Sequence, residues 1–207
     1  MPVPSILHEM REYLISDGLT LENRHADGRL NSSVNEEQIL ESLRKKFKIE
    51  EPNAREWYDF VAISGRERFP VNIKVSNLNT ADNVQCKLGI YYTLTGIWPD
   101  FGNGVSWETF FKMLSGDLSK GTRGDYYFLV VGKSDPTDII LTSLKQIGSL
   151  VPNGNNLPFQ CNWGRNRELK QRSHDEAVKF ILGVLGKSCE LRANIKSEFE
   201  RYLAGCI

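Results

Sequence analysis

The sequence has no run of about eighteen consecutive apolar residues, so it predicts no membrane-spanning helix. Its first residues, MPVPSILHEMREYL, lack the basic start and the apolar stretch that mark a secretory signal. The four cysteines are scattered and form no C-x-x-C pair, a spacing that argues against a zinc site and against a disulfide framework. We therefore expect a cytoplasmic protein with reduced thiols and no membrane contact.

Several catalytic signatures are also missing. The three histidines have no ligand-like spacing to one another or to a cysteine, and there is neither a Walker loop nor a G-x-G-x-x-G fingerprint. The formal net charge is +0, which argues weakly against a basic protein that coats nucleic acid without specificity. It leaves room for a DNA enzyme with a local basic surface, because carboxylates elsewhere cancel the sum.

What the sequence does contain is the composition of one globular domain. It has 207 residues, of which 40% are hydrophobic and 25% are charged, and this is enough for a sizeable core. It shows no internal repeat, no low-complexity tract and no clear linker. We therefore expect a single domain over residues 1–207.

Hydrophobic periodicity predicts the order of helices and strands. Helices are predicted at residues 5–15, 35–48, 80–95, 106–118, 173–185 and 188–203. Strands are predicted at residues 57–63, 69–75 and 126–131, residues 138–150 fit either form, and residues 16–33 and 152–167 are predicted loops. This mixture predicts an α/β (α+β) fold in which a central mixed β-sheet is flanked by helices.

The most informative feature is Asp59 in one predicted strand and Asn72-Ile73-Lys74 in the next, with a turn predicted at residues 65–68 between them. A magnesium-dependent phosphodiesterase needs hard oxygen ligands for its ion, and a positive group beside the reacting phosphate. Asp59 offers a carboxylate, Ile73 a backbone carbonyl and Asn72 an amide oxygen. Lys74 points the same way as Asn72, because strand side chains repeat every second residue. Taken singly, Asp59 could instead pair with Arg66, and Lys74 could be a surface lysine.

A further acid is expected from the helix predicted at residues 35–48. Glu36 lies on the same helix face as Ile39, Leu43 and Phe47, whereas Glu37 and Glu41 lie to the side. An acid on an apolar face needs a partner, and a metal ion is one. The alternative is a capping box, Ser33-x-x-Glu36, with Ser33 or Asn35 as the cap. Which of the three acids joins the site stays open.

The residues from 35 to 96 resemble those of type II restriction endonucleases of the PD-(D/E)xK nuclease superfamily. The resemblance is carried by the Asn35-Glu36 helix, YDF around Asp59, VNIKVS around Lys74, and NTADNVQCKLGIYYTLTG after it; the stretches DYYFLVV and SLVPNGNNLPFQCNW are also similar. It implies a restriction-endonuclease-like sheet, a homodimer, and Mg²⁺-dependent cleavage of double-stranded DNA in a restriction-modification system. Carried over by position, Asp59 is the first acid, Asn72 stands at the second acidic position, Lys74 is the lysine and Glu36 the upstream acid.

This sequence departs from the family pattern at two positions. Tyr58 replaces the proline before the first acid, and Asn72 replaces an Asp or Glu. A neutral amide is a poorer magnesium ligand than a carboxylate, so the second departure leaves the number of metal ions open. It also keeps two other functions open: a repair or structure-specific nuclease of the same fold, and a DNA-binding module whose catalytic site has decayed.

Polar clusters elsewhere are candidate DNA contacts. One cluster follows the strand predicted at residues 69–75 and consists of Asp82, Asn83, Gln85 and Lys87. The alternative to DNA contact for this cluster is simple helix capping by Asp82. A basic stretch with amides contains Asn162, Trp163, Arg165, Asn166, Arg167, Lys170 and Arg172. Arginine can read guanine and asparagine can read adenine in the major groove, although a solvated loop is an equal alternative. Asn155 and Asn156, in the turn formed by residues 153–156, are a third candidate, for which a surface turn is the simpler explanation.

Overall fold

The computed structural model describes residues 2–21, 28–52, 56–101, 104–118 and 120–203. A five-stranded sheet with the order β1-β2-β3-β5-β6 lies at its centre. Its strands are β1 (Ile49–Glu50), β2 (Phe60–Ser64), β3 (Glu67–Ser76), β5 (Tyr127–Gly132) and β6 (Ile139–Ser143). β3 and β5 run parallel and the other neighbours antiparallel, so the predicted mixed sheet is confirmed.

The β2–β3 hairpin forms where the sequence predicts it. Ser64 pairs with Glu67 across a tight turn, and Gly65 adopts a φ of 61°, a conformation that favours glycine. The predicted strand at residues 57–63 is shorter in the structure, because β2 begins at Phe60. Asp59 therefore lies just before the strand rather than within it.

A second sheet is a feature that the sequence did not predict. It contains β4 (Ala81–Val84), β8 (Phe159–Asn162) and β7 (Val151–Pro152), all antiparallel, in the order β4-β8-β7. The predicted helix at residues 80–95 is thus wrong in its first half, and the predicted loop at residues 152–167 is wrong where it contains strands. Each of these strands is too short to show a period of its own, and each forms only by pairing with residues far away in the chain.

The helices agree with the predictions in position more than in their ends. They are α1 (Ser5–Ser16), α2 (Gly28–Arg44), α3 (Lys87–Thr95), α4 (Trp107–Asp117), the 3₁₀ turn η1 (Trp163–Asn166) and α5 (His174–Leu203). α2 begins inside the predicted loop at residues 16–33, so Asn35 lies within the helix and the predicted capping box at Glu36 is wrong. The two predicted C-terminal helices are one, because glycines inside a helix weaken it without breaking it.

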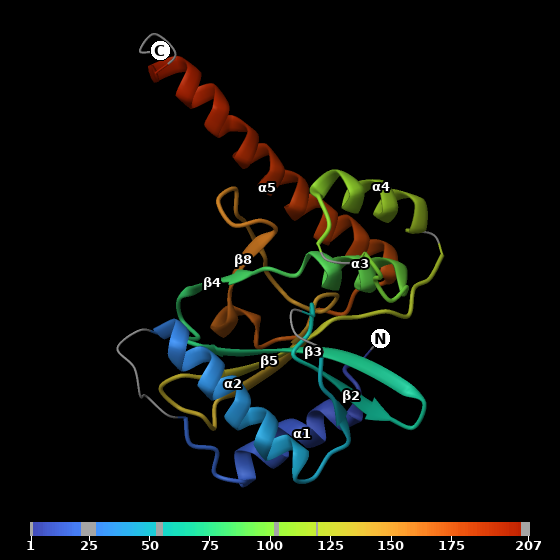
Figure 1. Ribbon diagram of the computed structural model, residues 1–207, viewed down its shortest axis with the longest axis vertical. Helices are drawn as coiled ribbons and strands as arrows, with labels where there is room; N and C mark the ends of the chain where they lie inside the picture. Colours follow the sequence, from blue (N-terminus) through green and yellow to red (C-terminus); the bar gives the residue numbers. More distant parts are fainter. Residues whose placement is uncertain (1, 22–27, 53–55, 102–103, 119, 204–207) are drawn as a thin grey trace.

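The helices cover both faces of the main sheet (Figure 1). α1 and α2 lie on one face, and α3, α4, α5 and the second sheet lie on the other. Alternate side chains of β3 divide between the layers: Val71 and Ile73 are buried in the core with α1 and α2, which directs Asn72 and Lys74 to the opposite face. No helix among the described residues is long and apolar enough to cross a membrane.

Candidate active site

The β2–β3 hairpin brings Asp59 against the middle of β3. The last hairpin pair is Phe60 with Val71, and the Asp59 amide then donates to the Val71 carbonyl at 2.9 Å. The Asp59 carboxylate continues the ladder with its side chain, because Oδ2 accepts from the Ile73 amide at 2.6 Å and from Asn72 Nδ2 at 2.8 Å. The predicted convergence of Asp59 with Asn72 and Ile73 is therefore confirmed.

Lys74 lies within electrostatic reach of both acids. Its charge lowers the pKa of Asp59 and of Glu36, although for each acid burial has the larger and opposite effect. The same ammonium group acts on Cys86, in the layer opposite α1 and α2, where burial raises the pKa of the thiol to about 12. The Lys74 ammonium group is thus close enough to the Asp59 carboxylate to affect its pKa.

Glu36 is the helix acid that faces this place. Burial is the main cause that raises the pKa of Glu36 to about 7, and the negative charge of Asp59 raises it further. Glu37 instead pairs with Arg44 at 2.7 Å, and Glu41 is exposed. Among the three candidate acids, Glu36 is therefore the one that the fold places with Asp59 and Lys74.

Asn72 holds Asp59 in place through its amide nitrogen, so the amide oxygen of Asn72 does not face Asp59. A carboxylate only accepts hydrogen bonds, so the Asn72 side chain presents Nδ2 to Asp59 Oδ2. Both bonds from β3 end on this one oxygen, Oδ2. Besides Asp59, the site has a second carboxylate on Glu36.

The chemistry of these donors fits a hard divalent cation. Nowhere in the described ranges do three His, Cys, Asp or Glu side chains gather, so Glu36 and Asp59 are the acids that this place offers. The charge of Asp59 raises the pKa of Glu36, and a cation between the two carboxylates would offset this repulsion. The Ile73 carbonyl as a ligand stays a prediction.

Tyr126 also lies at this site, although no sequence pattern points to it. It is 1% exposed and comes directly before β5. Its hydroxyl donates to the Trp57 carbonyl at 2.6 Å, two residues before Asp59. The pattern around Tyr126 in the sequence is that of an ordinary buried strand, which explains why its polar end was missed.

The predicted DNA contacts after β3 mostly have structural roles. Asp82 accepts a hydrogen bond from Trp163 Nε1 at 2.8 Å, and Asn83 accepts from Asn153 and Gln160 across the second sheet. Lys87 donates to the Val105 carbonyl at 2.5 Å. Of this group, Gln85 is the exposed residue.

The predicted basic stretch is also largely engaged within the protein. Asn166 is 1% exposed and forms hydrogen bonds with the backbone of Ser149. Arg167 donates two hydrogen bonds to the Asp138 carboxylate, at 2.8 and 2.6 Å. Arg172 donates to backbone carbonyls, that of Ile147 at 2.7 Å. Asn162 accepts from the Arg165 amide and donates to the Asn79 carbonyl. The candidate contacts that are exposed are Gln85, Asn155, Asn156, Arg165, Lys170 and the ion-paired Arg167.

Comparison with known proteins adds no name to this arrangement. No protein-family model matches the chain, and no curated protein matches it. The chemistry of Glu36, Asp59 and Lys74 is therefore the basis for a functional assignment.

Proposed function

We propose that this protein is a Mg²⁺-dependent deoxyribonuclease, a type II restriction endonuclease of the PD-(D/E)xK superfamily that hydrolyses double-stranded DNA at a specific site. The observation that carries the proposal is the Asp59 carboxylate held against β3 by the Ile73 amide and the Asn72 side chain, with Glu36 and Lys74 close enough to affect its surroundings. A pair of acids next to a lysine is what hydrolysis of a phosphodiester requires, because the phosphate brings negative charge that must be neutralised.

Each residue has a separate role in this proposal. Glu36, Asp59 Oδ1 and the Ile73 carbonyl hold the ion, and Asn72 fixes the Asp59 carboxylate through its Oδ2 atom. Bound Mg²⁺ supplies Lewis acidity toward the scissile phosphate. Lys74 orients the attacking water by hydrogen bonding and stabilises the negative charge that develops on the phosphate oxygens.

Recognition of DNA is assigned to residues that the fold leaves exposed. Gln85, Asn155, Asn156 and Arg165 offer amide and guanidinium groups that can bind base edges or phosphates. A palindromic target would be matched by a two-fold symmetric homodimer, with one active site for each strand.

Digestion of a sequenced plasmid by the purified protein tests this proposal. We expect discrete fragments with Mg²⁺ and none with EDTA, and run-off sequencing of the fragments should show one cut position in one recurring sequence. Cleavage of flapped or single-stranded substrates in preference to plasmid would point to a repair or structure-specific nuclease. DNA binding without any Mg²⁺-dependent cleavage would point to a decayed module, for which Asn72 is the supporting feature.

A further inference from the structure

We propose that Tyr126 is a positioning residue, whose hydroxyl fixes the Asp59 carboxylate by holding the preceding Trp57 backbone against β3. The catalytic consequence depends on the proposed nuclease function, whereas the positioning itself does not. The inference starts from a buried hydroxyl that an apolar core does not require.

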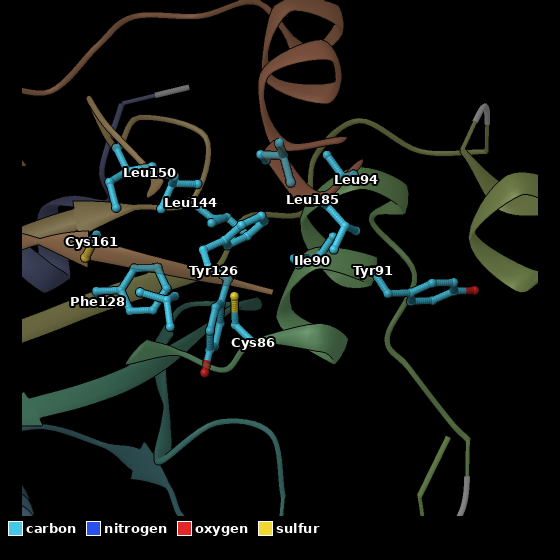
Figure 2. Packing of buried hydrophobic residues seen from close by; sticks show 14 of the residues in the cluster. Cys86, Ile90, Tyr91, Leu94, Tyr126, Phe128, Leu144, Leu150, Cys161 and Leu185 are labelled. Atoms are coloured by element: carbon cyan, nitrogen blue, oxygen red, sulfur yellow. The ribbon is translucent and has the colours of Figure 1, made fainter. Parts of the chain in front are cut away.

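The Tyr126 ring belongs to the core on the side of α3 and α5. It lies 5.1 Å from the Phe128 ring and 5.4 Å from the Trp57 ring, measured between ring centroids. Figure 2 shows Tyr126 beside Cys86, with its hydroxyl oxygen pointing away from the rest of the labelled cluster. The ring is therefore anchored in the core, and its polar end reaches toward the hairpin.

The hydroxyl connects the two segments that hold Asp59. It donates to the Trp57 carbonyl at 2.6 Å, and the Asn72 side chain lies near the same hydroxyl. Trp57 lies two residues before Asp59, and Asn72 donates to Asp59 Oδ2 at 2.8 Å. Movement of the hydroxyl would therefore affect Asp59 through the backbone that precedes it.

Gly89 shows how closely the ring is held. A β-carbon built at this position of α3 would lie 2.5 Å from Tyr126 Cδ1 and 2.8 Å from Cε1. These distances are too short for any side chain, so glycine is required here by the approach of the ring. A substitution at Gly89 must displace Tyr126, which gives a second way to test its role without changing the tyrosine.

Loss of the hydroxyl should loosen Asp59 without removing any charged group. The Trp57 carbonyl would lose its donor, and the segment that leads into Asp59 would be free to shift. Groups that orient a metal ligand typically change metal affinity or activity by about ten- to a hundredfold when they are removed. We therefore expect an effect on the site that exceeds the effect on folding.

The test compares Tyr126→Phe with Tyr127→Phe, which removes the hydroxyl of the neighbouring tyrosine on the opposite face of β5. The first readout is the Ile73 amide, because it donates to Asp59 Oδ2 and reports directly on that carboxylate. By NMR we expect an upfield shift of this amide proton and hydrogen exchange faster by roughly tenfold in Tyr126→Phe, as for the loss of one hydrogen bond. Tyr127→Phe should leave both unchanged, and Gly89→Ala should act like Tyr126→Phe.

The second readout is the Mg²⁺ concentration that gives half-maximal cleavage, which we expect to rise about tenfold in Tyr126→Phe. An Ile73 amide that is unaltered in Tyr126→Phe, or altered equally in Tyr127→Phe, would overturn the inference. That measurement needs neither metal nor DNA, so it decides the inference even if the wild-type protein fails to cleave DNA, a failure that would defeat the proposed function alone.

Discussion

At the scale of single residues, the main feature of the site is that burial disfavours the charged forms of its two acids. Glu36 and Asp59 both have a pKa above the ordinary value, with burial as the largest cause, and Lys74 opposes the shift in both. Such perturbed acids beside a lysine are typical of functional sites, because stability alone would favour neutral or fully paired groups. Asn72 reduces the free-energy cost of burying these negative charges, because it donates a hydrogen bond to Asp59. An acid at position 72 would instead add a third negative charge.

The cost of the Glu36 charge predicts how stability depends on pH. In the folded protein the pKa of Glu36 is about 7, against an ordinary value of 4.5, so the folded state disfavours the ionised form. The penalty is absent below about pH 4.5, grows as the pH rises toward 7, and is complete above it. Glu36→Gln should therefore match the wild type in stability near pH 4.5, and exceed it by about 2 kcal/mol at pH 8 without divalent metal, since solvent screening at the half-buried Glu36 reduces the full effect of the shift. Thermal unfolding across this range measures the difference.

The control for this prediction is Glu37→Gln, since Glu37 is exposed and pairs with Arg44 at the surface. It should not gain stability as the pH rises. If Glu36→Gln were less stable than the wild type at pH 8, Glu36 would be stabilised in its ionised form, and its place beside Asp59 would need another explanation.

Loss of the Asp59 charge should weaken metal binding directly. Asp59→Asn keeps the shape of the side chain and an oxygen that can accept from the Ile73 amide, but removes the negative charge. We expect Mg²⁺ affinity, measured by titration calorimetry, to fall by at least about tenfold. Asp135→Asn, in an exposed turn where Asp135 binds Thr137, should bind Mg²⁺ as the wild type does. Equal affinity in both variants would remove Asp59 from the metal site.

At the scale of secondary-structure elements, local patterns were predictable and distant pairings were not. Alternating Val71, Ile73 and Val75 and the glycine at position 65 are enough to predict the β2–β3 hairpin, since both signals are local. The second sheet depends on contacts such as Gln160 with Asn83, which are 77 positions apart. No local pattern carries that information, so residues 80–84 were assigned to a helix and residues 152–167 to a loop.

The same distinction applies to the site. Asp59, Asn72 and Lys74 were predictable because residue type and strand alternation place them together. Glu36 was one of three helix acids among which the sequence left the choice open. Tyr126 was not predictable, because its position in an apolar strand conceals the hydrogen bond to Trp57. Among the candidate DNA contacts, Asp82 and Asn166 bond within the fold, and the exposed Arg167 pairs with Asp138. Their contact with DNA stays a prediction.

The end of α3 gives a prediction at this scale. Gly96 closes the helix with a φ of 67°, and L-residues with a side chain adopt this conformation at a cost. Gly96→Ala should lower the free energy of unfolding by about 1–2 kcal/mol in chemical denaturation.

Gly116 in α4 is the matched control, because nothing lies within 4 Å of a β-carbon built there. Gly116→Ala should leave stability unchanged or raise it by up to about 1 kcal/mol, as alanine favours a helix. Equal effects of the two substitutions would show that the conformation of Gly96 does not limit stability.

At the scale of the whole molecule, the candidate active-site residues come from different layers of one fold. Glu36 is supplied by α2 on one face of the main sheet, whereas Asn72 and Lys74 point to the other face, and Asp59 lies just before β2. The fold must therefore be complete before these residues come together. The amides of Asn155 and Asn156, which we propose as DNA contacts, are exposed.

The most direct test of the central claim is Mg²⁺-dependent plasmid cleavage by Lys74→Ala, compared with the wild type and with Lys112→Ala, an exposed lysine of α4. We predict that the wild type and Lys112→Ala cut the plasmid, whereas Lys74→Ala binds the same DNA but cuts it at least about a hundredfold more slowly. Cleavage by Lys74→Ala at the wild-type rate would contradict the account, because the lysine beside Glu36 and Asp59 would then have no part in the reaction.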